Sequence, residues 1–224
     1  MISLNLRKRI NTSFLLFFLI YLILNYNFVL VYSLIVLGVI SIIEFYTLVK
    51  KILNNKILSF LVNLFFTLYI YFFCFMFFFF SNVLQLKIIL YSLLIGCVAS
   101  DIGGFVFGKL FNGPKLTKIS PNKTYSGALG GFVFAIILTV GFVIFIYKFF
   151  FIKIELSYHF ILMILFLSLV SQIGDLVISY FKRKSNLENT GNLIPGHGGI
   201  LDRIDGMIFV FPIFYIINQL LQIL

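Results

Sequence analysis

Long apolar runs separated by short polar segments are the feature that most limits how this chain can fold. Most runs have the roughly 20 residues that a helix needs to cross about 30 Å of hydrocarbon. They lack the alternating pattern of a membrane β-barrel, and a bilayer admits only helices or closed barrels. Of all residues, 62% are hydrophobic and 11% are charged, whereas soluble domains have about 25% charged residues. The sequence therefore predicts an all-α, polytopic membrane helical bundle.

We expect about seven transmembrane helices. The expected spans are Ile10–Leu24, Phe28–Val49, Ile57–Phe80, Leu86–Phe107, Gly127–Phe149, Leu156–Ser179 and Ile204–Ile223. The first span follows Arg7-Lys8-Arg9, as in a signal peptide, but no small-residue cleavage site follows it. We therefore expect a retained helix. We divide the single membrane domain into N-terminal helices, residues 1–85, and a C-terminal region, residues 86–224, which carries the polar motifs described below.

The Lys and Arg residues predict the orientation of the bundle. Of the 17 Lys and Arg residues, all but Lys87, Lys148 and Lys153 fall on one side of the expected spans. The positive-inside rule makes this side cytoplasmic, which places the N-terminus in the cytoplasm. The loops 109–126 and 180–203 then share the cytoplasmic side. The sequence thus predicts a multi-pass protein of the cell inner membrane with its site facing the cytoplasm. Contact with anionic lipid headgroups is the alternative role for many of these cations.

The segment from Ser179 to Asp205 is polar, charged and glycine-rich between two apolar runs. Just before it, Asp175 shares a helical face with Ser179, Lys182 and Arg183, at spacings of four, seven and eight residues. A carboxylate in a membrane span usually faces a polar cavity and has a partner. We expect Asp175 to be functional, and the alternative is an ion pair with Lys182 or Arg183 that holds helices together.

The C-terminal half of the segment carries a glycine turn and two carboxylates. Gly198 and Gly199 would let the backbone approach a phosphate. The interpretations of His197 are a hydrogen-bond donor to phosphate, a proton carrier or a turn residue. Asp202 is our preferred Mg²⁺ ligand, because Mg²⁺ takes one or two carboxylates together with phosphates and water. The alternative is that Asp202 and Asp205 cap a helix N-terminus.

An earlier pair of spans carries a second polar group of residues. Asp101 lies inside an expected span, and we expect it to be functional for the same reason as Asp175. Between the spans, Ser120 and Pro121 fit the N-cap and first residue of a helix, whose positive end, beside Lys123, could hold a phosphate. Small residues within these spans predict close helix packing: Gly104, Gly108, Gly127 and Gly131. We expect Cys74 and Cys97 to be buried hydrophobic residues.

These residues resemble the pattern of the phosphatidate cytidylyltransferase family, also called CDP-diacylglycerol synthases. The matching residues are Ser179, Lys182-Arg183, His197-Gly198-Gly199 and Asp202-Arg203-Ile204-Asp205, with Asp101, Lys118-Ile119-Ser120-Pro121-Asn122-Lys123-Thr124 and Gly174-Asp175-Leu176 upstream. The resemblance covers about the C-terminal half of the chain. The chain departs from the family at Glu188-Asn189, where the family has Lys-Asp, and at Ser126, where many relatives carry Glu.

The resemblance implies transfer of the cytidylyl group of CTP to phosphatidic acid, which gives CDP-diacylglycerol and pyrophosphate. It implies Mg²⁺ at Asp175 and Asp202, and a second cation is left open. The implied catalytic residues are Asp175, Asp202, Lys182, Arg183 and His197. The implied substrate-binding residues are Ser179, Lys118, Lys123, Ser120, Arg203, Gly198, Gly199 and Asp101.

The expected partners are CTP, phosphatidic acid and the lipid bilayer, without nucleic acid, and a homodimer is left open. Three alternatives accompany this interpretation. A CTP-dependent polyprenol kinase would transfer the γ-phosphoryl group instead. A non-enzymatic transporter would use Asp101 and Asp175 in an ion pathway. A homologue impaired by Glu188-Asn189 would have lost activity.

Overall fold

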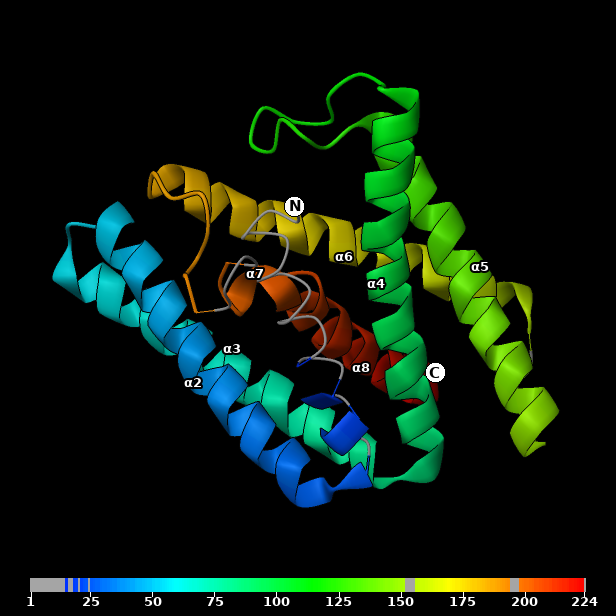
Figure 1. The fold of residues 1–224 in the computed structure, drawn as a ribbon. Coiled ribbons are helices and arrows are strands. Elements are labelled where there is room, and N and C mark those ends of the chain that lie inside the picture. The colour runs from blue at the N-terminus through cyan, green and yellow to red at the C-terminus, as the bar shows by residue number, and fades with distance from the viewer. Residues whose placement is uncertain are drawn as a thin grey trace, which may run out of the picture. The chain divides into compact units, whose positions relative to one another are not determined.

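A computed structural model describes residues 15, 18–19, 21–23, 25–151, 156–193 and 198–223, with side chains up to residue 219. In these residues every regular element is a helix (Figure 1), and an isolated antiparallel bridge joins Lys115 to Thr124. The prediction of an all-α protein is confirmed. Of the expected first span, Ile10–Leu24, the structure describes residues 15, 18–19 and 21–23, which are helical, and the Arg7–Arg9 cluster lies outside the described residues.

Among the described residues, five helices are long and apolar enough to cross a membrane. They are α2 (Asn27–Ile52), α3 (Lys56–Asn82), α4 (Leu84–Phe111), α5 (Tyr125–Phe150) and α6 (Tyr158–Lys184). They correspond to the second to sixth expected spans and are three to six residues longer, although α6 begins at Tyr158 rather than Leu156. These helices confirm the polytopic membrane class.

The expected start of the last span at Ile204 is wrong. A short helix, α7 (Leu201–Ile204), ends there, and α8 (Met207–Ile223) begins after Asp205 and Gly206. The Gly206 N–H donates to Asp205 Oδ1 at 2.8 Å. In a continuous helix this N–H would donate to a backbone carbonyl instead, so the side-chain bond competes with helix formation here. Gly206 also lies against Ser171 of α6 so closely that a Cβ atom there would overlap the Ser171 hydroxyl.

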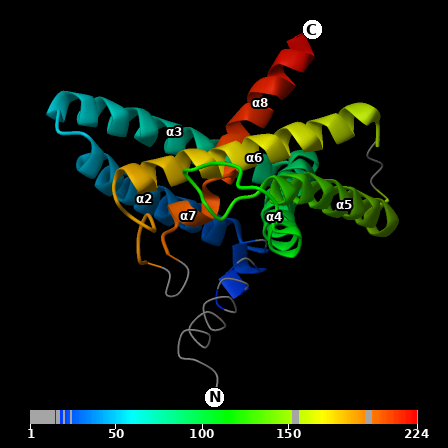
Figure 2. The same ribbon diagram turned by 90° about the horizontal axis from the view of Figure 1, so that it is seen from above.

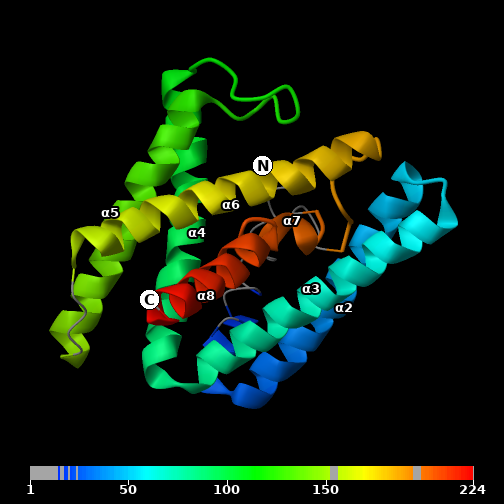
Figure 3. The same cartoon turned by 180° about the vertical axis from the view of Figure 1, so that it is seen from behind.

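The described chain forms two compact units that interleave along the sequence. The first consists of Met1–Phe78 and Phe181–Ile204. Within it, α2 and α3 form a hairpin, which Figures 1 and 3 show as two helices side by side. Phe45 of α2 stacks on Phe66 of α3 at a ring distance of 3.7 Å and meets Phe181 edge-on at 5.4 Å. The N-terminal helices therefore pack with part of the segment from Ser179 to Asp205, which we call the motif-bearing segment.

The second unit consists of Phe79–Tyr180 and Asp205–Leu224. Its α4 and α5 lie side by side in Figures 1 and 2, in close contact through glycines. A Cβ atom on Gly103 would overlap the Gly130 carbonyl oxygen, and one on Gly127 would come within 2.6 Å of the Gly104 oxygen. The expected close packing of these two spans is confirmed, because only hydrogen atoms fit between the backbones.

The loop between α4 and α5 differs from the sequence-based expectation at Ser120 and Pro121. These residues do not begin a helix: the Lys123 N–H donates to the Ser120 carbonyl at 3.1 Å and closes a turn. The helix begins at Tyr125, and Thr124 is its N-cap, with Oγ1 accepting from the Gly127 N–H at 3.0 Å. The fixed φ of proline suits the second position of a turn as well as a first helical turn, so Pro121 alone did not distinguish them.

Candidate functional site

A cavity of about 300 Å³, with charged and polar side chains in its lining, opens within the second unit. Residues of α4, the α4–α5 loop, α5 and α6 line it, and they include Ser100, Asp101, Ser120, Lys123, Gln172 and Asp175. Four of the residues expected from the sequence, Asp101, Ser120, Lys123 and Asp175, therefore share one cavity. They come from three separate segments of the chain, which the fold brings together.

Asp175 has partners on both carboxylate oxygens. Lys123 Nζ lies 2.6 Å from Oδ2, and the two side chains are 25% and 29% exposed. The Ser179 hydroxyl donates to Oδ1 at 3.2 Å from one turn further along α6, as their four-residue spacing predicts. The ion pair therefore joins Asp175 to Lys123 on the α4–α5 loop, whereas the sequence alone suggested Lys182 or Arg183. The pair is accessible from the cavity, so a ligand can reach it.

Gln172 is a site residue that the sequence analysis missed. Its Nε2 donates to the Ala128 carbonyl of α5 at 3.3 Å and to the Ser100 hydroxyl of α4 at 3.4 Å. The backbone carbonyl of Gln172 accepts from Lys123 Nζ at 3.4 Å. An amide within an apolar span is a signal that could have identified it, because such a group needs hydrogen-bond partners. Gln172 thus ties α4, α5 and α6 together beside the Lys123–Asp175 pair.

Asp205, which lies between α7 and α8, is a third carboxyl group that interacts electrostatically with Asp175 and Asp101. Burial, followed by the charges of Asp175 and Asp101, raises the pKa of Asp205 to about 8. In the described part of the chain, no group of three or more His, Cys, Asp and Glu side chains could hold a metal ion. A cation at these carboxylates would therefore need substrate phosphates or water as additional ligands.

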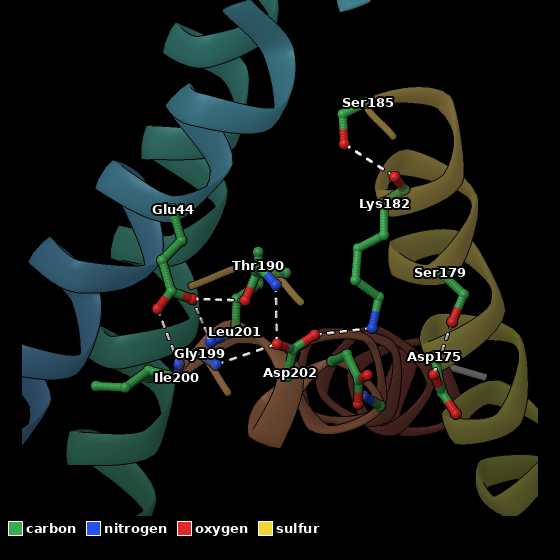
Figure 4. A network of polar contacts seen from close by, with 12 residues as sticks. Glu44, Asp175, Ser179, Lys182, Ser185, Thr190, Gly199, Ile200, Leu201 and Asp202 are labelled. Carbon is green, nitrogen blue, oxygen red and sulfur yellow. Dashed lines mark hydrogen bonds and ion pairs between the residues drawn. The ribbon is translucent and has the colours of Figure 1, made fainter. Parts of the chain in front are cut away.

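A second polar cluster belongs to the first unit and centres on Asp202 (Figure 4). Lys182 Nζ lies 2.7 Å from Asp202 Oδ1, and the two side chains are 13% and 8% exposed. Oδ2 accepts from the N–H groups of Thr190, at 2.9 Å, and Gly199, at 3.1 Å. Burial alone would raise the pKa of Asp202, but the hydrogen bonds from Lys182, Thr190 and Gly199 outweigh it and lower the pKa. Asp202 is thus held as a carboxylate.

Glu44 of α2 is the second residue that the sequence analysis missed. It is 5% exposed, and Figure 4 shows it facing the motif-bearing segment. Its Oε2 accepts from Thr190 Oγ1 at 2.8 Å and from the Leu201 N–H at 2.9 Å, and its Oε1 accepts from the Ile200 N–H at 3.0 Å. Glu44 is the single acidic residue in its apolar run. A lone acid in a membrane span is usually functional, so this signal was present in the sequence.

The other expected site residues are distributed as follows. Lys118, Arg183 and Arg203 are exposed, and Ser179 is buried. Gly198 has a φ of +85°, a conformation that favours glycine, and Gly199 is buried beside Glu44 and Thr190. His197 lies outside the described residues. Asp175 belongs to one compact unit and Asp202 to the other.

Fold and site together define a polytopic α-helical membrane protein with lysine–carboxylate pairs in its polar regions. The chain belongs to the Cytidylyltransferase family, whose sequence profile matches residues 1–221. This membership confirms the resemblance drawn from the motifs.

Individual relatives resemble the chain over about half of their own length. A phosphatidate cytidylyltransferase of Staphylococcus haemolyticus is 38% identical over 145 residues, which is 64% of this chain and 53% of that protein. The enzymes of the same name from Rickettsia bellii and Bacillus subtilis are 44% and 41% identical over 124 residues. These matches cover 54% of this chain and 53% and 44% of the two relatives.

Proposed function

We propose that the protein is a phosphatidate cytidylyltransferase, which converts CTP and phosphatidic acid into CDP-diacylglycerol and pyrophosphate. The observation that carries this proposal is the Lys123–Asp175 pair in a cavity of a membrane-helix bundle, 2.6 Å between charged atoms. The pair offers a cation for phosphate and a carboxylate for a metal in one place. The names of the relatives support the same activity.

In the proposed reaction, an oxygen of the phosphatidate phosphate forms a bond to the α-phosphorus of CTP. The bond from that phosphorus to the bridging oxygen breaks, and pyrophosphate leaves with the electron pair. The attacking phosphate is already anionic, so no strong general base is needed. Catalysis of this type depends on positioning and on neutralising phosphate charge. We assign this neutralisation to Lys123 in the cavity and to Lys118, an exposed cation on the same loop.

The carboxylates fit Mg²⁺ to different degrees. Asp175 is partly exposed and lines the cavity, so its oxygens are available beside a bound phosphate. Asp202, also expected as a ligand, has both oxygens engaged by three donors, so a cation would have to compete with Lys182, Thr190 and Gly199. When bound, Mg²⁺ would stabilise the negative charge of the phosphates during transfer.

We also propose that the site faces the cytoplasm of a bacterial cell from the plasma membrane. The relatives that share the family name are bacterial. The excess of Lys and Arg in the loops 109–126 and 180–203 favours the cytoplasmic side for both. CTP is available on that side.

The test uses purified protein in detergent micelles that contain phosphatidic acid, with Mg²⁺ and CTP labelled at the α-phosphate. Label that enters the lipid phase, with release of pyrophosphate and loss of the reaction in EDTA, would support the proposal. Asp175→Asn should abolish turnover in folded protein, whereas Lys115→Met, an exposed substitution in the same loop, should not. Production of CDP would indicate a lipid kinase instead. Folded wild-type protein that labels no lipid would refute the proposal.

A further inference from the structure

We propose that Glu44 is a positioning residue. It fixes one part of the motif-bearing segment, the residues from Thr190 to Asp202, in the active form. Among the described residues of this segment, only Leu201 and Asp202 lie in a helix, the single-turn α7, so the segment needs anchors from elsewhere. Glu44 supplies one from α2, far away in the sequence. This role extends the proposed function, because it assigns part of the site to the N-terminal helices.

The contacts of Glu44 join both ends of the segment. The Thr190 hydroxyl donates from the first end, and the N–H groups of Ile200 and Leu201 donate from the other. The latter two lie at the start of α7, where N–H groups have no partner within the helix. A carboxylate has only acceptors, and hydrogen bonds to a charged oxygen are roughly twice as strong as neutral ones. Glu44 therefore holds Thr190 beside the start of α7 through one buried acceptor group.

Glu44 is also linked to Asp202 through shared residues. Thr190 donates its hydroxyl to Glu44 and its N–H to Asp202. Gly199 donates to Asp202, and the next residue, Ile200, donates to Glu44. The position of Glu44 thus sets where the two backbone donors of Asp202 lie. Asp202 in turn holds Lys182 at 2.7 Å.

Two glycines of the segment are explained by the approach of Glu44. A Cβ atom on Gly191 would lie 2.5 Å from Glu44 Oε1, and its three nearest neighbours would all be Glu44 atoms. A Cβ atom on Gly199 would lie 2.5 Å from Glu44 Oε2 and would also overlap Thr190 Oγ1. Neither glycine has a positive φ, so the need for glycine is steric. The Glu44 carboxylate accounts for glycine at position 191, and Glu44 together with the Thr190 hydroxyl accounts for it at position 199.

The first test is a double-mutant cycle between Glu44→Ala and Gly191→Ala, read by hydrogen exchange of the backbone in the 190–201 segment. Glu44→Ala should raise exchange at Ile200 and Leu201 about five- to tenfold, because each loses a hydrogen bond. Gly191→Ala should disturb the segment in the wild type but add little in the Glu44→Ala protein, where the space is free. Equal effects of Gly191→Ala in both backgrounds would overturn the proposal.

Ser41→Ala is the matched control for this cycle. Ser41 is fully buried on the same helix, and its hydroxyl donates to the Leu37 carbonyl within α2. The control should leave exchange in the 190–201 segment unchanged. If it raised exchange as much as Glu44→Ala does, a general loosening of α2 would be the cause, and the proposal would be overturned.

The second test measures turnover by Glu44→Gln and Glu44→Ala. Gln keeps the size of the side chain and one acceptor oxygen, so it should retain more activity than Ala. We expect kcat to fall about 10- to 100-fold in Glu44→Ala, since small displacements of reacting groups have such effects. The KM for CTP should change much less. Wild-type kcat in both variants would refute a positioning role. Hydrogen exchange needs no substrate, so it tests Glu44 even if the proposed activity fails.

Discussion

Lys123 and Asp175 form an ion pair of 2.6 Å that connects the loop before α5 to helix α6. The two residues belong to motif blocks that are far apart in the sequence, and both line the same cavity. Lys123 sits at the end of a turn closed by Ser120, directly before the Thr124 cap of α5. The turn and the cap together hold the lysine in place, so its position follows from local backbone structure.

Replacing Lys123 with Met should abolish most of the proposed turnover. The substitution removes a cation that would neutralise phosphate, and it leaves Asp175 without its closest partner. Removal of one preorganised electrostatic group typically costs about 10²- to 10³-fold in kcat. Lys123→Arg should retain more activity than Lys123→Met because the charge is kept. The measurement is labelled-lipid formation, and Lys115→Met in the same loop serves as the control.

The Lys182–Asp202 pair should stabilise the fold as well as serve the site. Both side chains are largely buried, and Asp202 has two further backbone donors. Loss of one partner from a buried pair typically costs about 3–5 kcal/mol. We expect Lys182→Met and Asp202→Asn each to lower the free energy of unfolding, and the double variant to cost less than the sum.

Denaturant unfolding followed by circular dichroism would measure these changes, since the chain contains no Trp for fluorescence. Strictly additive effects of the two substitutions would contradict a direct interaction between Lys182 and Asp202.

Gly103→Ala should destabilise the α4–α5 contact. A Cβ atom at Gly103 would overlap the Gly130 carbonyl and come within 2.7 Å of Phe134 Cβ. Overpacking of this kind typically costs about 1–3 kcal/mol. Gly141→Ala on α5 is the matched control, because a Cβ atom there would meet nothing within 4 Å. A thermal unfolding temperature that falls equally in both variants would argue against the close helix contact.

Asp205→Asn should make stability less dependent on pH. The pKa of Asp205 is raised from 3.8 to about 8, so the folded protein holds the proton more tightly than the unfolded chain does. The resulting stability is fully present below the unfolded value and is lost as the pH rises through about 8. We therefore expect Asp205→Asn to unfold at a higher temperature than the wild type at about pH 9, with a smaller difference at about pH 5. The scans would be run in EDTA, and a parallel pH dependence in both proteins would contradict the prediction.

The sequence determined the class of the protein and most of its helices. Apolar runs of membrane length fix helices because a bilayer leaves backbone groups no other partner, and this holds without tertiary contacts. The motif residues also indicated the family and the residues that line the cavity, including Asp101, Lys123 and Asp175. Their spacing predicted the Asp175–Ser179 contact, since helical periodicity is local.

Tertiary structure decided which charged groups became partners. Asp175 pairs with Lys123 rather than with Lys182, which pairs with Asp202, and no local periodicity contains this information. Glu44 is the clearest case: its three donors come from Thr190, Ile200 and Leu201, well over a hundred residues along the chain. A buried carboxylate must find donors wherever the fold provides them, so only the packed structure reveals which ones it uses.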